Sequence, residues 1–87
     1  MFFTYILQSL KDQSFYIGFS SNLEQRLIKH NNASTGYTAS KKSWKIVYFE
    51  TFQLESDARK RERDIKKKKS RKYIEYLIQH WNGPSVG

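Results

Sequence analysis

The chain has 87 residues and carries 16 Lys and Arg against 8 Asp and Glu, a net charge of +8. This length allows one compact domain and excludes two, while the charge favours a polyanionic partner such as DNA or RNA. Because no Cys occurs, disulfides and thiolate metal sites are excluded.

The N-terminal segment predicts a β-hairpin. Residues 2–10 and 15–19 are both rich in β-forming side chains, and a polar link, residues 11–14, separates them. The first run is too short to span a membrane and does not look like a signal peptide. We therefore expect a cytoplasmic protein.

The middle of the chain predicts a helix, a loop and a strand. Ser21 and Glu24 have the spacing of a capping box, so a helix is expected to run from there to about Asn31. Residues 32–43 are small, polar and basic, which is typical of a loop. Alternation in the strand expected over residues 44–52 predicts one face with Trp44, Ile46, Tyr48 and Glu50 and another with Val47, Phe49 and Thr51.

The C-terminal part predicts two helices. Ser56 is a candidate cap for a helix over about residues 56–69, and Ser70 is a candidate cap for another that Asn82-Gly83-Pro84 ends. A core-facing stripe in the last helix consists of Tyr73, Ile74, Leu77, Ile78 and Trp81.

The expected order is therefore β-β-α-β-α-α, an α+β fold with a three-stranded antiparallel sheet and flanking helices. We expect one domain over residues 1–82 and a short tail over residues 83–87.

Charged and polar residues border the apolar faces of two predicted helices. On a helical wheel, Arg26 and His30 flank the same buried stripe of the first helix. Glu62 lies close to Ala58 and Ile65, the apolar residues of the second helix. A carboxylate there needs a cation, a metal or hydrogen-bond donors, and Lys66 at i+4 is the ordinary partner. Taken singly, these residues fit structural roles as well as functional ones.

Several short motifs follow one another along the chain. They are Phe3-Thr4-Tyr5, Tyr16-Ile17-Gly18, Arg26 and His30 within residues 22–31, Tyr37-Thr38, and Glu62 within residues 58–67. In this order and spacing, residues 3 to about 72 resemble the GIY-YIG nuclease family, especially its small single-domain bacterial branch. The chain is also similar to the N-terminal nuclease domain of the C subunit of the excision-repair excinuclease. Only Tyr5 matches the first triplet of the family name, whereas the second triplet is complete.

The resemblance implies a divalent-metal-dependent endonuclease that hydrolyses DNA phosphodiester bonds, in DNA repair or recombination. Glu62 would hold a single Mg²⁺ or Mn²⁺, because these hard ions prefer carboxylate oxygen and keep several waters. Arg26 would hold the phosphate. Tyr5, Tyr16 and His30 are all candidates for the general base; a tyrosine is favoured, with His30 in support.

Further residues are expected to contact nucleic acid, and DNA is the expected partner, with RNA left open. The basic segment 59–72 holds ten of the 16 Lys and Arg. The expected contacts are Gly18, Tyr37, Lys41, Lys42, Lys66, Lys67 and Lys69. Neither a small-molecule cofactor nor a membrane surface is expected, since the basic helix lacks a broad apolar face. The oligomeric state and the structure of the substrate stay open.

A rival interpretation is a non-catalytic nucleic-acid-binding module that keeps the fold and the charge. Some members of the family carry a supporting Asn late in the domain, and here no Asn follows the second predicted helix before Asn82.

Overall fold

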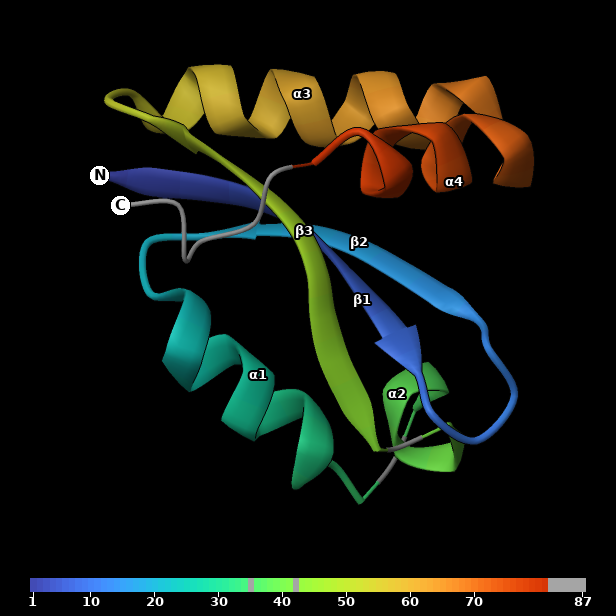
Figure 1. Cartoon of the computed structure of the whole chain (residues 1–87). Helices are drawn as coiled ribbons and strands as arrows, with labels where there is room; N and C mark the ends of the chain where they lie inside the picture. The colour runs from blue at the N-terminus through green and yellow to red at the C-terminus, as the bar shows by residue number, and fades with distance from the viewer. Residues whose placement is uncertain (35, 42, 82–87) are drawn as a thin grey trace.

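The computed structural model describes residues 1–34, 36–41 and 43–81, which form a three-stranded antiparallel sheet covered by helices (Figure 1). The strands are β1 (Phe2–Ser9), β2 (Phe15–Ser20) and β3 (Trp44–Phe52), in the spatial order β2-β1-β3. The helices are α1 (Leu23–Asn31), α2 (Tyr37–Ser40), α3 (Glu55–Lys68) and α4 (Arg71–Gln79). The predicted α+β fold is confirmed; the four-residue α2 lies in a segment predicted as loop.

The hairpin of β1 and β2 forms as predicted and places β1 in the middle of the sheet. Tyr5 lies opposite Gly18 on β2 and opposite Phe49 on β3. Because β1 has a strand on each side and helices over both faces, residues 4–7 are all buried. β2 is an edge strand, and the candidate site described below lies beside it.

The alternation predicted for β3 is interrupted by a bulge. Ile6 pairs with Tyr48 but Leu7 pairs with Ile46, so Val47 is an extra residue on β3. An extra residue turns the following side chains to the opposite face. Hence Tyr48 packs with Ile6 and Ile46 packs near Leu7, and the prediction of an uninterrupted alternation is wrong.

Helices cover the two faces of the sheet separately (Figure 1). The face toward α1 has the buried residues Tyr5, Leu7 and Trp44. The face toward α3 and α4 has the buried residues Ile6, Tyr48, Ile65 and Ile74. The stripe predicted for α4 is confirmed, because its apolar side chains pack against this second cluster.

The start of α1 differs from the prediction by one residue. Asn22, in an extended conformation, is the N-cap, and its Oδ1 accepts a 3.0 Å hydrogen bond from the Gln25 N–H. The Ser20 hydroxyl accepts a hydrogen bond from the Asn22 N–H, which fixes the turn before the helix. The capping box predicted at Ser21 is therefore wrong.

Of the two N-caps predicted for the later helices, one is wrong and one is confirmed. α3 begins at Glu55 after Leu54, which makes no side-chain cap, so Ser56 does not cap it. Ser70 does cap α4, since its hydroxyl accepts a hydrogen bond from the Tyr73 N–H at 3.1 Å.

A buried hydrogen bond ties the central strand to α3. The Thr4 hydroxyl donates to the Ala58 carbonyl at 2.7 Å, and both residues are fully buried. This contact fixes the position of α3 along β1.

Within the described residues, no helix is long and apolar enough to cross a lipid bilayer. The predicted helix stop at Asn82-Gly83-Pro84 and the tail over residues 83–87 lie outside the described residues.

Candidate active site

Two tyrosines from the hairpin lie together on the sheet face toward α1. The rings of Tyr5 and Tyr16 are stacked, with centroids 6.4 Å apart and planes 28° from parallel. A Cβ added to Gly18 would lie 2.6 Å from the Tyr5 hydroxyl oxygen and 3.1 Å from a Tyr16 ring carbon. The absence of a side chain at Gly18 therefore leaves the space on β2 that the Tyr5 ring, from β1, occupies. The expected contact of Gly18 with nucleic acid stays a prediction.

His30, near the end of α1, joins the two tyrosines. Its Nε2 shares a 3.2 Å hydrogen bond with the Tyr5 hydroxyl, and its ring centroid lies 4.5 Å from that of Tyr16. The side chain is buried, with 8% of the residue exposed. The helical wheel indicated this inward position.

Asn31 fixes the end of α1 and was missed in the sequence. Its side-chain amide donates to the Trp44 carbonyl at 3.2 Å, and its Oδ1 accepts from the Trp44 N–H at 2.6 Å. The indole of Trp44 in turn contacts the Tyr16 ring edge, with centroids 6.2 Å apart. Asn31 thus holds its neighbour His30 against the tyrosines. Its place directly after the inward-facing His was the available signal.

Arg26 and Glu62 lie within electrostatic reach of the Tyr5 hydroxyl, although they come from helices on opposite faces of the sheet. Burial has the largest effect on the pKa of Tyr5 and raises it; the positive charge of Arg26 lowers this pKa, and the negative charge of Glu62 raises it. Together with burial, the positive charge of Arg26 also lowers the pKa of His30. Among the described residues, no carboxylate forms an ion pair with Arg26. Arg26 lines a surface hollow of about 290 Å³ beside the start of α1, together with Lys29.

The pKa values of the hydrogen-bonded pair are shifted in opposite directions. Burial is the largest cause that raises the pKa of Tyr5 well above its usual 10.0, and the neighbouring Tyr16 adds to it. Burial also lowers the pKa of His30 below its usual 6.5, helped by the positive charges of Arg26 and Lys29. At neutral pH, Tyr5 is therefore a protonated phenol and His30 a neutral imidazole.

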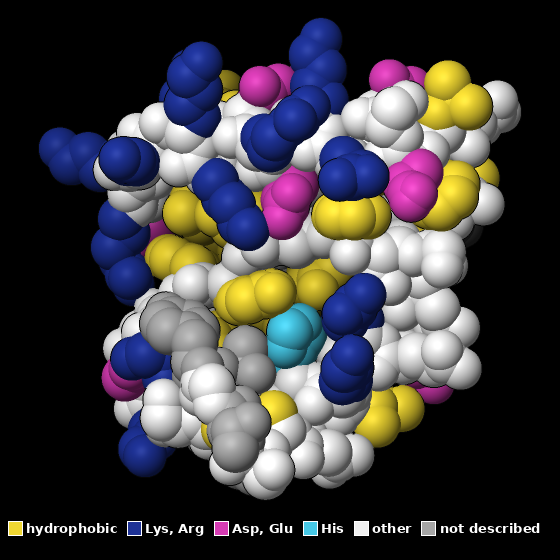
Figure 2. Space-filling view, turned by 180° about the vertical axis from the view of Figure 1, so that it is seen from behind, with side chains coloured by type: hydrophobic (Ala, Val, Ile, Leu, Met, Phe, Trp, Pro, Cys, Tyr) yellow, Lys and Arg dark blue, Asp and Glu magenta, His cyan; other side chains and the backbone are white. Residues whose placement is uncertain are grey.

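These groups converge at the edge of the sheet formed by β2. Figure 2 shows this side of the molecule, with a histidine below a hydrophobic surface, an acidic side chain above it, and Lys and Arg side chains around both. A polymeric substrate can approach an open edge of this kind from the side. Arg26 and His30 belong to α1 on one face of the sheet, and Glu62 belongs to α3, which packs on β2 and β1 from the other face.

Glu62 is the acidic residue of this cluster. Its side chain is only 16% exposed and accepts a 2.8 Å hydrogen bond from the Lys66 ammonium, the ordinary partner expected from the sequence. No group of three or more His, Asp or Glu side chains gathers as a metal site in the described part of the chain. A single carboxylate fits Mg²⁺ or Mn²⁺, which commonly take one or two carboxylates and fill the remaining positions with water and substrate phosphate.

The lysines expected to contact nucleic acid lie in different surroundings. Lys41 forms a 2.5 Å ion pair with Asp12 in the hairpin loop. Lys67 is exposed on α3, and Lys69 ends α3 in a left-handed conformation with φ 47°. Lys42 and the side chain of Tyr37 lie outside what the structure describes.

Relatives with similar sequences are small bacterial proteins. A UPF0213 protein of Clostridium perfringens is 44% identical over 68 residues, which cover 77% of this chain and 72% of the relative. A UPF0213 protein of Syntrophus aciditrophicus is 34% identical over 80 residues, covering 90% of this chain and 91% of the relative.

A solved structure has the same fold. The solution NMR structure of a UPF0213 protein from Bacillus halodurans matches with a TM-score of 0.59 and 29% identity, over 97% of this chain and 89% of that one. The family model of the GIY-YIG catalytic domain matches residues 1–84. Because this match spans nearly the whole chain, the chain belongs to the GIY-YIG catalytic domain family.

Proposed function

We propose that this chain is a divalent-metal-dependent endonuclease that hydrolyses phosphodiester bonds of DNA. The observation that carries the proposal is the hydrogen-bonded Tyr5–His30 pair, with Tyr16 stacked on Tyr5 and the charges of Arg26 and Glu62 acting on the Tyr5 hydroxyl. The family to which the chain belongs is a family of catalytic domains that act on nucleic acid, which supports the same function. A role in DNA repair or recombination stays a prediction from kinship.

Arg26 binds the phosphate that is cut. It lines a surface hollow without a paired carboxylate among the described residues, and a guanidinium donates two parallel hydrogen bonds to phosphate oxygens. Its positive charge compensates the charge that grows on the phosphate oxygens as water attacks.

The Tyr5–His30 pair takes the proton of the attacking water. A free Tyr5 phenolate is disfavoured, because burial raises the pKa of Tyr5. A relay avoids the phenolate: the Tyr5 Oη accepts a proton from water while its own proton moves to the neutral Nε2 of His30, 3.2 Å away. Tyr16, which is half-buried beside both rings, orients the substrate at the strand edge.

Glu62 would hold the metal ion. Its negative charge acts on the Tyr5 hydroxyl, so the carboxylate belongs to the same electrostatic environment as the proton acceptor. When bound, Mg²⁺ or Mn²⁺ would stabilise the charge on the phosphate and on the leaving oxygen. Lys66, which donates to this carboxylate, would have to release it when the ion binds, and its ammonium would then be available to a backbone phosphate.

A plasmid-nicking assay with Mn²⁺ tests the proposal. We expect the wild type to nick supercoiled DNA, and Glu62→Gln and Arg26→Ala to lose about 100-fold or more of the rate. Glu55→Gln is the matched control, because Glu55 is an exposed residue of the same helix with no ion pair among the described residues. Equal rates for all four preparations would refute the proposal and indicate a contaminating nuclease.

A second candidate function, nucleic-acid binding without catalysis, is favoured by the ion pair between Glu62 and Lys66. If this pair persists when Mn²⁺ is added, the carboxylate is not a metal ligand. An NMR titration with Mn²⁺ separates the two functions. Selective broadening of signals from Glu62, Tyr5 and Tyr16 supports the enzyme, and broadening scattered over the surface supports the binding module.

A further inference from the structure

A second hollow lies next to the candidate active site, on the other side of β2. Its volume is about 370 Å³, within the range of about 300–1,000 Å³ that is usual for small-ligand sites. Residues from β2 and from the junction of α3 and α4 line it. Tyr16 belongs to its lining and also stacks with Tyr5, so the hollow and the candidate active site share a residue.

The walls of the hollow are apolar and its rim is cationic. The apolar lining consists of Phe15, Ile17, Ile65 and Ile74. The rim carries Lys66, Lys69 and Arg71, and no acidic side chain of the described residues is part of the lining. This combination suits a flat apolar group attached to an anion.

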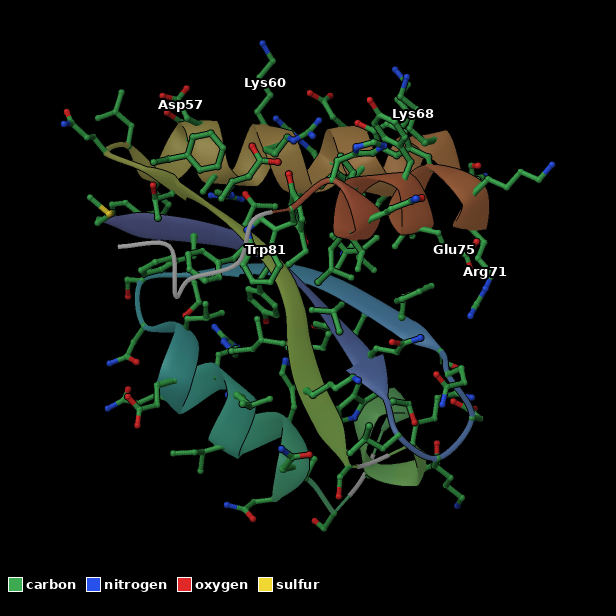
Figure 3. The ribbon with its side chains drawn as sticks, viewed as in Figure 1. Asp57, Lys60, Lys68, Arg71, Glu75 and Trp81 are labelled. Carbon is green, nitrogen blue, oxygen red and sulfur yellow. The ribbon has the colours of Figure 1, made fainter. Side chains whose placement is uncertain are left out.

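Arg71 is held in place at this rim. Its guanidinium lies over the Phe15 ring, 4.6 Å from the centroid. It also donates to the Glu75 carboxylate and to the Gln13 carbonyl, both at 3.1 Å, and Figure 3 shows it extending from the start of α4. The rim is therefore preorganised on this side, which reduces the entropy lost when a ligand binds.

Lys69 supplies the other part of the rim through an unusual backbone conformation. It has φ 47°, in the left-handed region, and it ends α3 directly before Ser70 caps α4. Among the described residues its ammonium has no ion-pair partner. It is thus available for a phosphate.

We propose that this hollow binds one unpaired nucleobase of the strand that is cut, with Lys69 and Arg71 on the adjoining phosphates. This inference rests on the proposed function and specifies its substrate class. A base inside a duplex is stacked and paired and does not enter such a hollow without being flipped out. The substrates of the site therefore carry unpaired nucleotides next to the cut, as single strands, flaps and junctions do.

Binding in EDTA tests the inference without any cleavage. The probes are a single-stranded thymidine hexanucleotide and an abasic hexanucleotide with the same phosphates, added to the full chain with labelled Ile methyl groups. We expect the thymidine strand to shift the methyl signals of Ile17 and Ile74 and to leave Ile28, which is 52% exposed on α1, unchanged. It should also bind at least about fivefold more tightly than the abasic strand.

A pair of variants tests the rim. Lys69→Gly removes the ammonium at a position where glycine is favoured by the backbone, so the fold should be kept or stabilised. Lys60→Ala removes the same charge from the outer side of α3, where Figure 3 shows Lys60 pointing away from the sheet. We expect Lys69→Gly to lower the slope of log affinity against log salt by about 0.7 for the single strand, and Lys60→Ala to leave it unchanged.

Two results would overturn the inference: methyl signals of the hollow that do not move, or that move equally with the abasic strand. Either result would leave the proposed nuclease untouched if plasmid nicking still depends on Glu62. Loss of nicking with selective methyl shifts would instead overturn the nuclease and keep the base-binding hollow.

Discussion

Replacing Gly18 by Ala is expected to displace Tyr5 and disrupt the candidate active site. The new Cβ would lie 2.6 Å from the Tyr5 hydroxyl oxygen and 2.8 Å from Cζ. To reach an ordinary contact of 3.4 Å, the hydroxyl must move by about 0.8 Å. Tyr5 cannot move freely, because it is 2% exposed and hydrogen-bonded to His30.

The magnitude follows from this overpacking. Extra atoms in a packed interior cost about 1–3 kcal/mol, and each kcal/mol lowers the melting temperature of a domain of this size by about 4–8 °C. The backbone φ of Gly18 lies outside the left-handed region, so the whole cost comes from the ring contact. The rate of nicking should fall together with the stability, because displacement of the Tyr5 ring breaks its hydrogen bond to His30.

Gly36→Ala is the matched control. Gly36 has φ +88°, and apart from its chain neighbours no described residue has an atom within 4 Å of an added Cβ, so alanine there strains the backbone, by about 1–3 kcal/mol, without touching the tyrosines. Thermal unfolding followed by circular dichroism should show that both variants are destabilised. Only Gly18→Ala should change the ¹⁵N shifts of the His30 ring. A Gly18→Ala protein with wild-type stability and wild-type His30 shifts would refute the reasoning.

Three further predictions concern the same site. Because folding lowers the pKa of His30, the unfolded state binds more protons just below pH 6.5; the melting temperature of the wild type should therefore fall as the pH drops through this range, and His30→Gln should reduce this slope. Tyr5→Phe should destabilise the fold by about 1–3 kcal/mol, because it leaves a buried His30 nitrogen without its hydrogen-bond partner. Tyr16→Phe should slow nicking with little effect on urea denaturation. Equal losses of stability in the two variants would contradict this assignment. Lys66→Ala should tighten Mn²⁺ binding in calorimetry, because it removes the ion pair that competes for Glu62. The gain should not exceed about fivefold, since a partly exposed ion pair contributes only about 0.2–1 kcal/mol. Weaker Mn²⁺ binding would contradict this prediction.

The fold was largely predictable from the sequence because its signals are local. Hairpin periodicity and the apolar stripe of α4 each depend on neighbouring residues, and both are confirmed. The bulge at Val47 was not predictable, since it arises from pairing with β1 and leaves no mark in an alternating strand. Asn22 and Ser21 are both good caps, and the hydrogen bond that the Asn22 N–H donates to the preceding Ser20 side chain favours Asn22.

The candidate site was predictable in composition but not in its electrostatics. The wheel placed His30 and Glu62 near apolar faces, and both are largely buried. The sequence favours a tyrosine as the general base, and such a base works best with a pKa lowered toward neutral pH. Burial instead raises the pKa of Tyr5, and burial of a hydroxyl beneath α1 is a tertiary effect that no spacing of residues encodes.

The Thr4–Ala58 hydrogen bond gives a reason for the departure of this chain from the first triplet of its family. In an α-helix, the Ala58 carbonyl is also the acceptor for the backbone N–H four residues later, which belongs to Glu62. One oxygen therefore joins the strand that carries Tyr5 to the turn that carries the carboxylate. Thr4 therefore fixes the position of α3 along β1. An isoleucine at this position would keep the strand but lose the hydrogen bond, so Glu62 could shift along the sheet relative to the Tyr5 hydroxyl.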